Sequence, residues 1–212
     1  MKYTTYLFDF DYTLADSSKG IVTCFRIVLD RHHYTDISDE AIKRTIGKTL
    51  EDSFSILTGI KDPETLAAWR KEYSIESAKY MNKNTFFFPE TITTLTELKK
   101  QGVRIGIIST KYRHMIVSYL KESQAEEWFD LIIGGEDVSR HKPHPEGLLL
   151  AIEQLQATPS KTLYIGDSTV DAETAAAANI DFVGVTNGIT TDKELKAYPH
   201  KKIVDNLTGV LK

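Results

Sequence analysis

The N-terminus of the chain carries the run Thr5-Tyr6-Leu7-Phe8-Asp9-Phe10-Asp11-Tyr12-Thr13, in which two aspartates follow a short apolar segment. The apolar residues predict a β-strand, and this strand would carry Asp9 and Asp11 into the loop at its carboxyl end. A buried carboxylate is costly unless another group compensates its charge, and aspartate oxygens suit a hard cation such as Mg²⁺. An aspartate beside a metal ion can also act as a nucleophile. The segment therefore predicts Mg²⁺-dependent chemistry on a phosphate group at the edge of a sheet.

Short β-rich segments alternate with helical patterns over most of the remaining chain. This alternation predicts an α/β fold, a Rossmann-like doubly wound parallel sheet with helices on both faces. The expected strands are residues 5–9, 103–109, 131–133, 162–165, 182–185 and 202–204, and the expected helices between them are residues 91–101, 113–123, 145–155 and 170–178.

One long segment breaks the alternation, because every pattern in it is helical. The expected helices cover residues 19–31, 39–46, 50–57 and 63–81. Asp62 followed by Pro63 marks the beginning of the last of these helices. We therefore expect two domains, an α/β core formed by residues 1–15 and 85–212 and an inserted all-helical cap domain formed by residues 16–84.

The bulk composition limits the classes of function. The chain has 212 residues, 41% of them hydrophobic and 26% charged, which is typical of a soluble globular protein. Its net charge of −4 argues against a nucleic-acid-binding surface, and no apolar run approaches the roughly 18 residues of a membrane span. The single cysteine, Cys24, excludes a disulfide within the chain and fits a reducing compartment. We expect a cytoplasmic monomer or homodimer that binds neither nucleic acid nor membranes.

Polar residues follow four of the expected strands. Open parallel sheets bind ligands at the carboxyl ends of their strands, so these residues are expected on one edge of the sheet. They are Asp9, Asp11 and Thr13 after the first strand, Ser109, Thr110 and Lys111 after the second, Lys142 beyond the third, and Asp167 and Asp171 after the fourth. Each has an ordinary interpretation when taken singly, such as a turn, a loop or a helix N-cap. Together they predict phosphoryl transfer, which needs a nucleophile, a metal ion and donors for the phosphate oxygens.

The four segments resemble the four motifs of the haloacid dehalogenase superfamily. The first is similar to Asp-x-Asp-x-Thr, the second is represented by Ser109, the third by Lys142 in Lys142-Pro143-His144-Pro145, and the fourth by Gly166-Asp167-Ser168-Thr169-Val170-Asp171. The inserted helices are similar to the small cap of the phosphoglycolate phosphatase and β-phosphoglucomutase branch. Two positions depart from the family pattern: Tyr12 replaces the usual glycine, and Thr110 stands where asparagine is frequent.

The resemblance implies a role for each candidate residue. Asp9 is implied as the nucleophile that forms an aspartyl-phosphate, Asp11 as the general acid and base, and Lys142 as the group that offsets negative charge. The implied Mg²⁺ ligands are Asp9, Asp11 through its backbone carbonyl, and Asp167, with Asp171 behind them. The implied phosphate-binding residues are Ser109, Thr110 and Thr13, and the implied substrate contacts in the cap are Gly47 and Lys48. Lys48 fits equally well as a solvated residue before a helix.

By this resemblance, the chain is expected to be a Mg²⁺-dependent phosphatase acting on a small phosphorylated metabolite, such as phosphoglycolate or a sugar phosphate. The motifs allow two alternatives, a β-phosphoglucomutase-type phosphotransferase and an inorganic pyrophosphatase. A non-catalytic binding protein on the same fold is disfavoured, because Asp9, Asp11, Lys142 and Asp167 are all present. Dehalogenation is disfavoured by Asp11, since a halide leaving group needs no proton.

Overall fold

The computed structural model describes residues 2–211, which form two compact units. The segment Asp16–Phe86 forms one unit, and the chain on either side of it forms the other. The chain enters and leaves the first unit through β2 (Ala15–Asp16) and β3 (Phe86–Phe87), which pair as a separate two-stranded sheet. None of the helices within residues 2–211 has the length and apolar character that crossing a bilayer requires.

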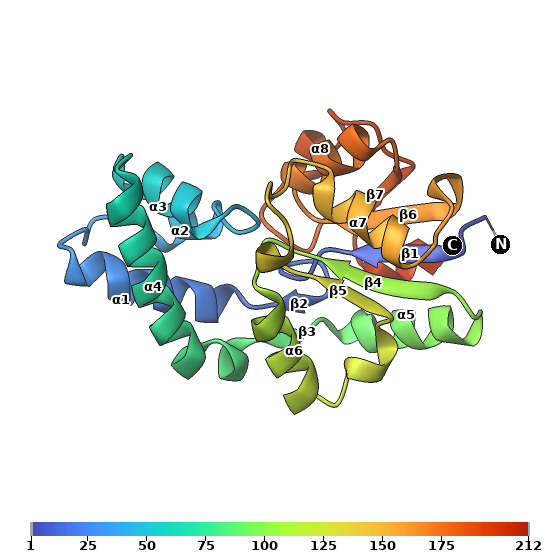
Figure 1. Ribbon diagram of the computed structural model, residues 1–212, viewed down its shortest axis with the longest axis horizontal. Helices are drawn as coiled ribbons and strands as arrows, with labels where there is room; N and C mark the ends of the chain where they lie inside the picture. Colours follow the sequence, from blue (N-terminus) through green and yellow to red (C-terminus); the bar gives the residue numbers. More distant parts are fainter. Residues whose placement is uncertain (1, 212) are drawn as a thin grey trace. The chain divides into compact units, whose positions relative to one another are not determined.

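Six parallel strands form the sheet of the α/β unit, in the order β5-β4-β1-β6-β7-β8 (Figure 1). The strands are β1 (Thr5–Phe8), β4 (Arg104–Ile108), β5 (Leu131–Ile133), β6 (Thr162–Gly166), β7 (Asp181–Val185) and β8 (Lys202–Val204). In the register, Phe8 at the end of β1 pairs with Ile107 of β4 and Ile165 of β6. The chain adds strands first on one side of β1 and then on the other. The edge beyond the carboxyl end of β1 is therefore the switch point at which such sheets bind ligands.

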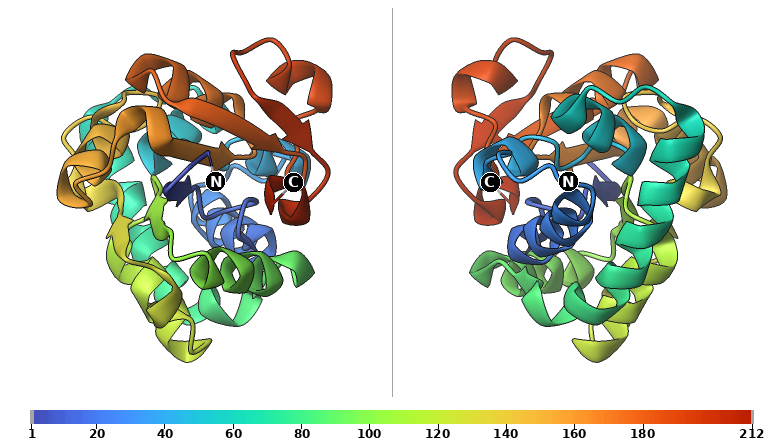
Figure 2. Two further views of the ribbon diagram at one scale, coloured as in Figure 1. Left: turned by 90° about the vertical axis from the view of Figure 1, so that its right-hand side faces the viewer. Right: turned by 90° about the vertical axis from the view of Figure 1, so that its left-hand side faces the viewer.

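Helices cover both faces of this sheet, as the views in Figure 2 show. Successive strand residues point to opposite faces, so Phe8 lies in one hydrophobic core and Leu7 in the other. The core around Phe8 includes residues of α5 (Pro89–Lys100) and α6 (Arg113–Glu122). The core around Leu7 includes residues of α7 (Glu146–Gln154), α8 (Thr169–Ala178) and α9 (Asp192–Leu195). The prediction of an α/β, doubly wound parallel sheet is confirmed.

Short 3₁₀ turns complete the α/β unit, at Glu126–Trp128, Gly135–Asp137, Pro159–Lys161 and Leu207–Leu211. The sequence pattern does not predict α9, a helix of one turn that begins with a capping box between Thr191 and Glu194. A helix this short has too few internal hydrogen bonds to produce a periodic pattern, and it forms because Leu195 is fully buried.

The other unit consists of four α-helices and one 3₁₀ turn. They are α1 (Ser18–Arg31), α2 (Asp39–Lys43), α3 (Leu50–Thr58), α4 (Pro63–Tyr80) and the turn Asn82–Asn84. Its core is aromatic: the ring centroid of Phe54 lies 4.7 Å from that of Phe25 and 5.4 Å from that of Trp69. The helix expected over residues 39–46 ends earlier, because the chain turns after Lys43 and Gly47 adopts a φ of +95°.

Candidate active site

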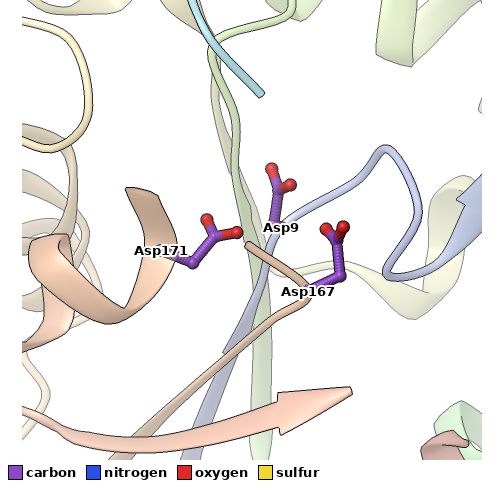
Figure 3. A group of neighbouring side chains, drawn as sticks. All are labelled: Asp9, Asp167 and Asp171. Carbon is purple, nitrogen blue, oxygen red and sulfur yellow. The ribbon is translucent and has the colours of Figure 1, made fainter. Parts of the chain in front are cut away.

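Three buried aspartates meet at the carboxyl edge of the parallel sheet (Figure 3). Asp9 follows β1, Asp167 follows β6, and Asp171 lies in the first turn of α8. One carboxylate oxygen of each residue lies within 4.8 Å of the others. Their exposed fractions are 2%, 5% and 0%, so their mutual repulsion is poorly screened by water.

One ammonium group lies among these carboxylates. The Nζ of Lys142 lies 2.9 Å from Asp9 Oδ1 and 2.6 Å from Asp171 Oδ1. Burial lowers the pKa of Lys142, but the charges of Asp171 and Asp9 outweigh burial and hold that pKa above its ordinary range. Lys142 is therefore charged at neutral pH, and a single positive charge faces three carboxyl groups.

Burial, together with the surplus of negative charge, raises the pKa of two of the aspartates. Burial raises the pKa of Asp9 to about 7, with the charge of Lys142 opposing this effect and that of Asp171 reinforcing it. Burial, followed by the charges of Asp171 and Asp9, raises the pKa of Asp167 well above its ordinary value. A divalent cation between the two carboxylates would favour their ionised forms.

Asp171 is held on both of its carboxylate oxygens by protein groups. Oδ1 accepts hydrogen bonds from Lys142 and from the hydroxyl of Tyr164, at 2.6 and 2.8 Å. Oδ2 accepts hydrogen bonds from the backbone N–H of Ser168 at 3.1 Å and from its hydroxyl at 2.5 Å. The bond from the backbone N–H is one half of the capping box that begins α8. Asp171 therefore orients Lys142, and protein donors already contact both of its carboxylate oxygens.

Thr13 lies against Asp167. Its side chain is fully buried, and its hydroxyl donates to Asp167 Oδ1 at 3.2 Å. This hydrogen bond orients the carboxylate of Asp167, and the phosphate contact that the resemblance implies for Thr13 stays a prediction.

Asp11 has a charged partner, Lys111, which the sequence places after the second strand but to which no role was assigned. The Nζ of Lys111 donates to Asp11 Oδ1 at 2.8 Å, and the two side chains are 7% and 10% exposed. Position after the strand predicted that Lys111 lies at this edge of the sheet, but not that it pairs with Asp11. Tyr164, which contacts Lys142 and Asp171, was also missed, and no local signal identifies it because it lies within a buried strand.

Ser109 and Thr110 lie directly after β4, the strand beside β1. The backbone N–H of Ser109 donates to the carbonyl of Ile133 at 3.0 Å, and its hydroxyl accepts from the backbone N–H of Lys111 at 3.2 Å. The structure therefore brings both residues to the sheet edge that carries Asp9.

Tyr12 occupies a backbone conformation that favours glycine. Its φ is +60°, and its N–H donates to the carbonyl of Ala15 at 2.8 Å. A left-handed conformation costs a residue with a Cβ about 1–2 kcal/mol, which explains why glycine suits this turn. The tight turn is nevertheless formed with tyrosine, and Asp11 keeps its contact with Lys111.

The helical unit contains the two predicted cap residues. Gly47 and Lys48 lie in the connection between α2 and α3. Lys48 lines a surface pocket of about 500 Å³ within this unit. The pocket is lined by Asp36, Ile37, Ser38, Ala41, Arg44, Thr45, Lys48, Ile56 and Leu57.

The parallel sheet and the carboxylates at its switch point are those of an α/β protein of the class that binds ligands at the carboxyl ends of its strands. Residues 6–185 match the profile of the haloacid dehalogenase-like hydrolases. The chain belongs to this family.

Individual relatives agree with this assignment. A solved structure described as a haloacid dehalogenase-like hydrolase from Bacteroides fragilis is 66% identical, with a TM-score of 0.97 over 99% of this chain and 100% of that one. Pyrophosphatase PpaX from Bacillus mycoides is 32% identical over 211 residues, covering 100% of this chain and 96% of the relative. A predicted phosphoglycolate phosphatase from Haemophilus somnus, 19% identical with a TM-score of 0.90 over 100% of this chain and 97% of that one, shares the fold. The predictions of the family and of a phosphatase-type enzyme are confirmed.

Proposed function

We propose that this protein is a Mg²⁺-dependent phosphatase that hydrolyses a small phosphorylated metabolite, with Asp9 as the nucleophile. The observation that carries the proposal is the environment of Asp9. Its buried carboxylate follows the central strand, lies 2.9 Å from a charged lysine, and has the carboxylate of Asp167 beside it. This arrangement brings a nucleophile, a compensating cation and a metal-binding group to one point.

The first step transfers the phosphoryl group to the protein. An oxygen of Asp9 attacks phosphorus, the bond from phosphorus to the leaving oxygen breaks, and Asp11 donates a proton to that oxygen. Lys142 keeps its proton and offsets the negative charge that gathers around Asp9. Ser109 and Thr110 donate hydrogen bonds to the phosphate oxygens.

The second step releases phosphate. Asp11, now a carboxylate, takes a proton from water, whose oxygen attacks phosphorus and breaks the bond to Asp9. Phosphate leaves, and both aspartates return to their initial states. Lys111 holds Asp11 in place by the 2.8 Å contact.

The donor set fits Mg²⁺. The ligands would be the carboxylates of Asp9 and Asp167 and the backbone carbonyl of Asp11, which are the oxygen donors that Mg²⁺ prefers. The fit rests on the excess of carboxyl groups over ammonium groups and on the raised pKa of Asp9 and Asp167. When bound, the ion would stabilise negative charge on the phosphoryl oxygens.

Inorganic pyrophosphate is the second candidate substrate. It is favoured by relatives named pyrophosphatase PpaX, which align with the whole of this chain. The same two steps apply, with phosphate as the leaving group. A mutase would differ in the second step, since it returns the phosphoryl group to a sugar.

Phosphate release from a panel of compounds tests the proposal. The panel contains phosphoglycolate, hexose phosphates, nucleotides and pyrophosphate with Mg²⁺, and Asp9→Asn is the control. Release by the wild type that is lost in the variant supports the proposal, and the preferred compound identifies the substrate class. Absence of release, together with isomerisation of β-glucose 1-phosphate, would replace hydrolysis by the mutase reaction.

A further inference from the structure

We infer that Gly188, in the turn after β7, is a positioning residue for Asp167 and thereby for the metal site. The inference rests on the proposed function for its metal ion. Gly188 lies outside the four motifs discussed above, and it follows a strand that carries none of the candidate residues.

The backbone of Gly188 lies directly against the carboxylate of Asp167. A Cβ atom at position 188 would lie 2.2 Å from Asp167 Oδ2 and 3.1 Å from Asp167 Cγ. It would also lie 3.1 Å from the Cβ of Tyr12. The first distance is far below van der Waals contact, so a side chain at this position requires Asp167 or the turn to move.

Lack of space for a side chain, rather than a positive φ, accounts for glycine at position 188. The glycines with positive φ among residues 2–211 are Gly47, Gly59 and Gly102, so the backbone at Gly188 has a conformation open to other residues. The neighbouring strand β6 also has a glycine packed closely against an aspartate, because a Cβ at Gly166 would lie 2.4 Å from the Cβ of Asp171. Glycines after β7 and at the end of β6 thus leave room for one aspartate each.

Gly188 and Thr13 hold Asp167 from two directions. The hydroxyl of Thr13 donates to Oδ1 at 3.2 Å, while the backbone of Gly188 stands against Oδ2. The two contacts restrict the rotation of the carboxylate and keep one of its oxygens within 4.8 Å of Asp9 and Asp171. Groups that orient a metal ligand in this way typically change metal affinity by about 10- to 100-fold when they are altered.

Magnesium binding by calorimetry tests the inference directly. We expect Gly188→Ala to raise the Kd for Mg²⁺ by about 10- to 100-fold. The matched control is Gly184→Ala in β7, where a Cβ would lie 3.0 Å from the flexible end of Leu195. The control is expected to keep the wild-type Kd within about threefold. A wild-type Kd in Gly188→Ala, or equal weakening in both variants, would overturn the inference.

A double-mutant cycle separates positioning from general damage to the fold. In EDTA, Gly188→Ala should lower the urea midpoint of unfolding. It should do so much less in an Asp167→Ala background, where Oδ2 and Cγ of Asp167 are absent and only the 3.1 Å approach to the Cβ of Tyr12 remains. Equal losses in both backgrounds would show that Gly188 does not act through Asp167. If Gly188→Ala fails to fold, recovery of folding in the double variant supports the inference and failure of both contradicts it.

The two experiments also separate this inference from the proposed function. A wild-type protein that binds no Mg²⁺ would refute the metal-dependent function. The cycle in EDTA would then still decide whether Gly188 positions Asp167, because it requires neither metal nor activity.

Discussion

Replacing Asp9 by asparagine is expected to stabilise the metal-free protein above neutral pH, although it removes the proposed nucleophile. Asp9 is 2% exposed, and burial raises its pKa to about 7, opposed by Lys142 and reinforced by Asp171. In the unfolded chain, its carboxyl group titrates near the ordinary value of 3.8. At pH 8 the folded wild type therefore contains a carboxylate that costs more free energy than the same group in the unfolded chain.

The difference between the two pKa values sets the size of the effect. A difference between 3.8 and about 7 corresponds to about 4 kcal/mol of the free energy of unfolding. The substitution also removes the 2.9 Å ion pair between Asp9 and Lys142. Lys142 still has its ion pair with Asp171, at 2.6 Å. The net gain is therefore expected to lie between about 1 and 4 kcal/mol, or at least about 2 °C in the melting temperature of a chain of this length.

The gain follows pH in a defined direction. Because the folded-state pKa of Asp9 is raised, the folded wild type holds a proton that the unfolded chain has already released between about pH 4 and pH 7. Wild-type stability falls as the pH rises through this window. Asparagine does not titrate, so the free energy of unfolding of the variant exceeds that of the wild type only slightly near pH 4. The difference reaches its full size above about pH 7.

Urea unfolding in EDTA at several pH values measures this advantage. The control is Asp181→Asn, because hydrogen bonds from Lys201 and Tyr3 outweigh burial and lower the pKa of Asp181. Above the pKa of Asp181, the free energy of unfolding of Asp181→Asn should be lower than that of the wild type. This change is opposite in sign to the one expected for Asp9→Asn. An Asp9→Asn protein that is less stable than the wild type at pH 8, or a difference that does not change with pH, would refute the reasoning.

Three further outcomes are expected. EDTA should stop phosphate release and Mg²⁺ should restore it; activity indifferent to both would contradict Asp9 and Asp167 as metal ligands. Asp171→Asn should lower the free energy of unfolding by about 3 kcal/mol, because Lys142 loses its partner at 2.6 Å, and urea unfolding would detect the loss. Lys111→Met should reduce kcat/KM by about tenfold or more, because Asp11 loses its charged partner at 2.8 Å, with partial recovery in Lys111→Arg. Unchanged kinetics in Lys111→Met would remove this residue from the proposed site.

Strong local patterns predicted most elements of the fold. The strands Leu131–Ile133 and Lys202–Val204 have the predicted bounds, and the other four strands of the six-stranded sheet begin and end within one residue of theirs. The two-residue strands β2 and β3 were not predicted. Asp62 and Pro63 begin α4 as expected. The errors fall on short elements, such as the overlong helix at residues 39–46 and the missed α9, where few local hydrogen bonds compete with tertiary packing.

The sequence by itself determined which chemical groups follow which strand, because hydrophobic periodicity and turn residues act over a few positions. That was sufficient to place Asp9, Asp167 and Lys142 at one edge of a parallel sheet. Only the tertiary structure decided the pairs within that site. Lys111 and Asp11 are separated by 100 positions, and Thr13 and Asp167 by 154. Such contacts depend on strand order and on the space beside each carboxylate, and local backbone preferences carry no information about either.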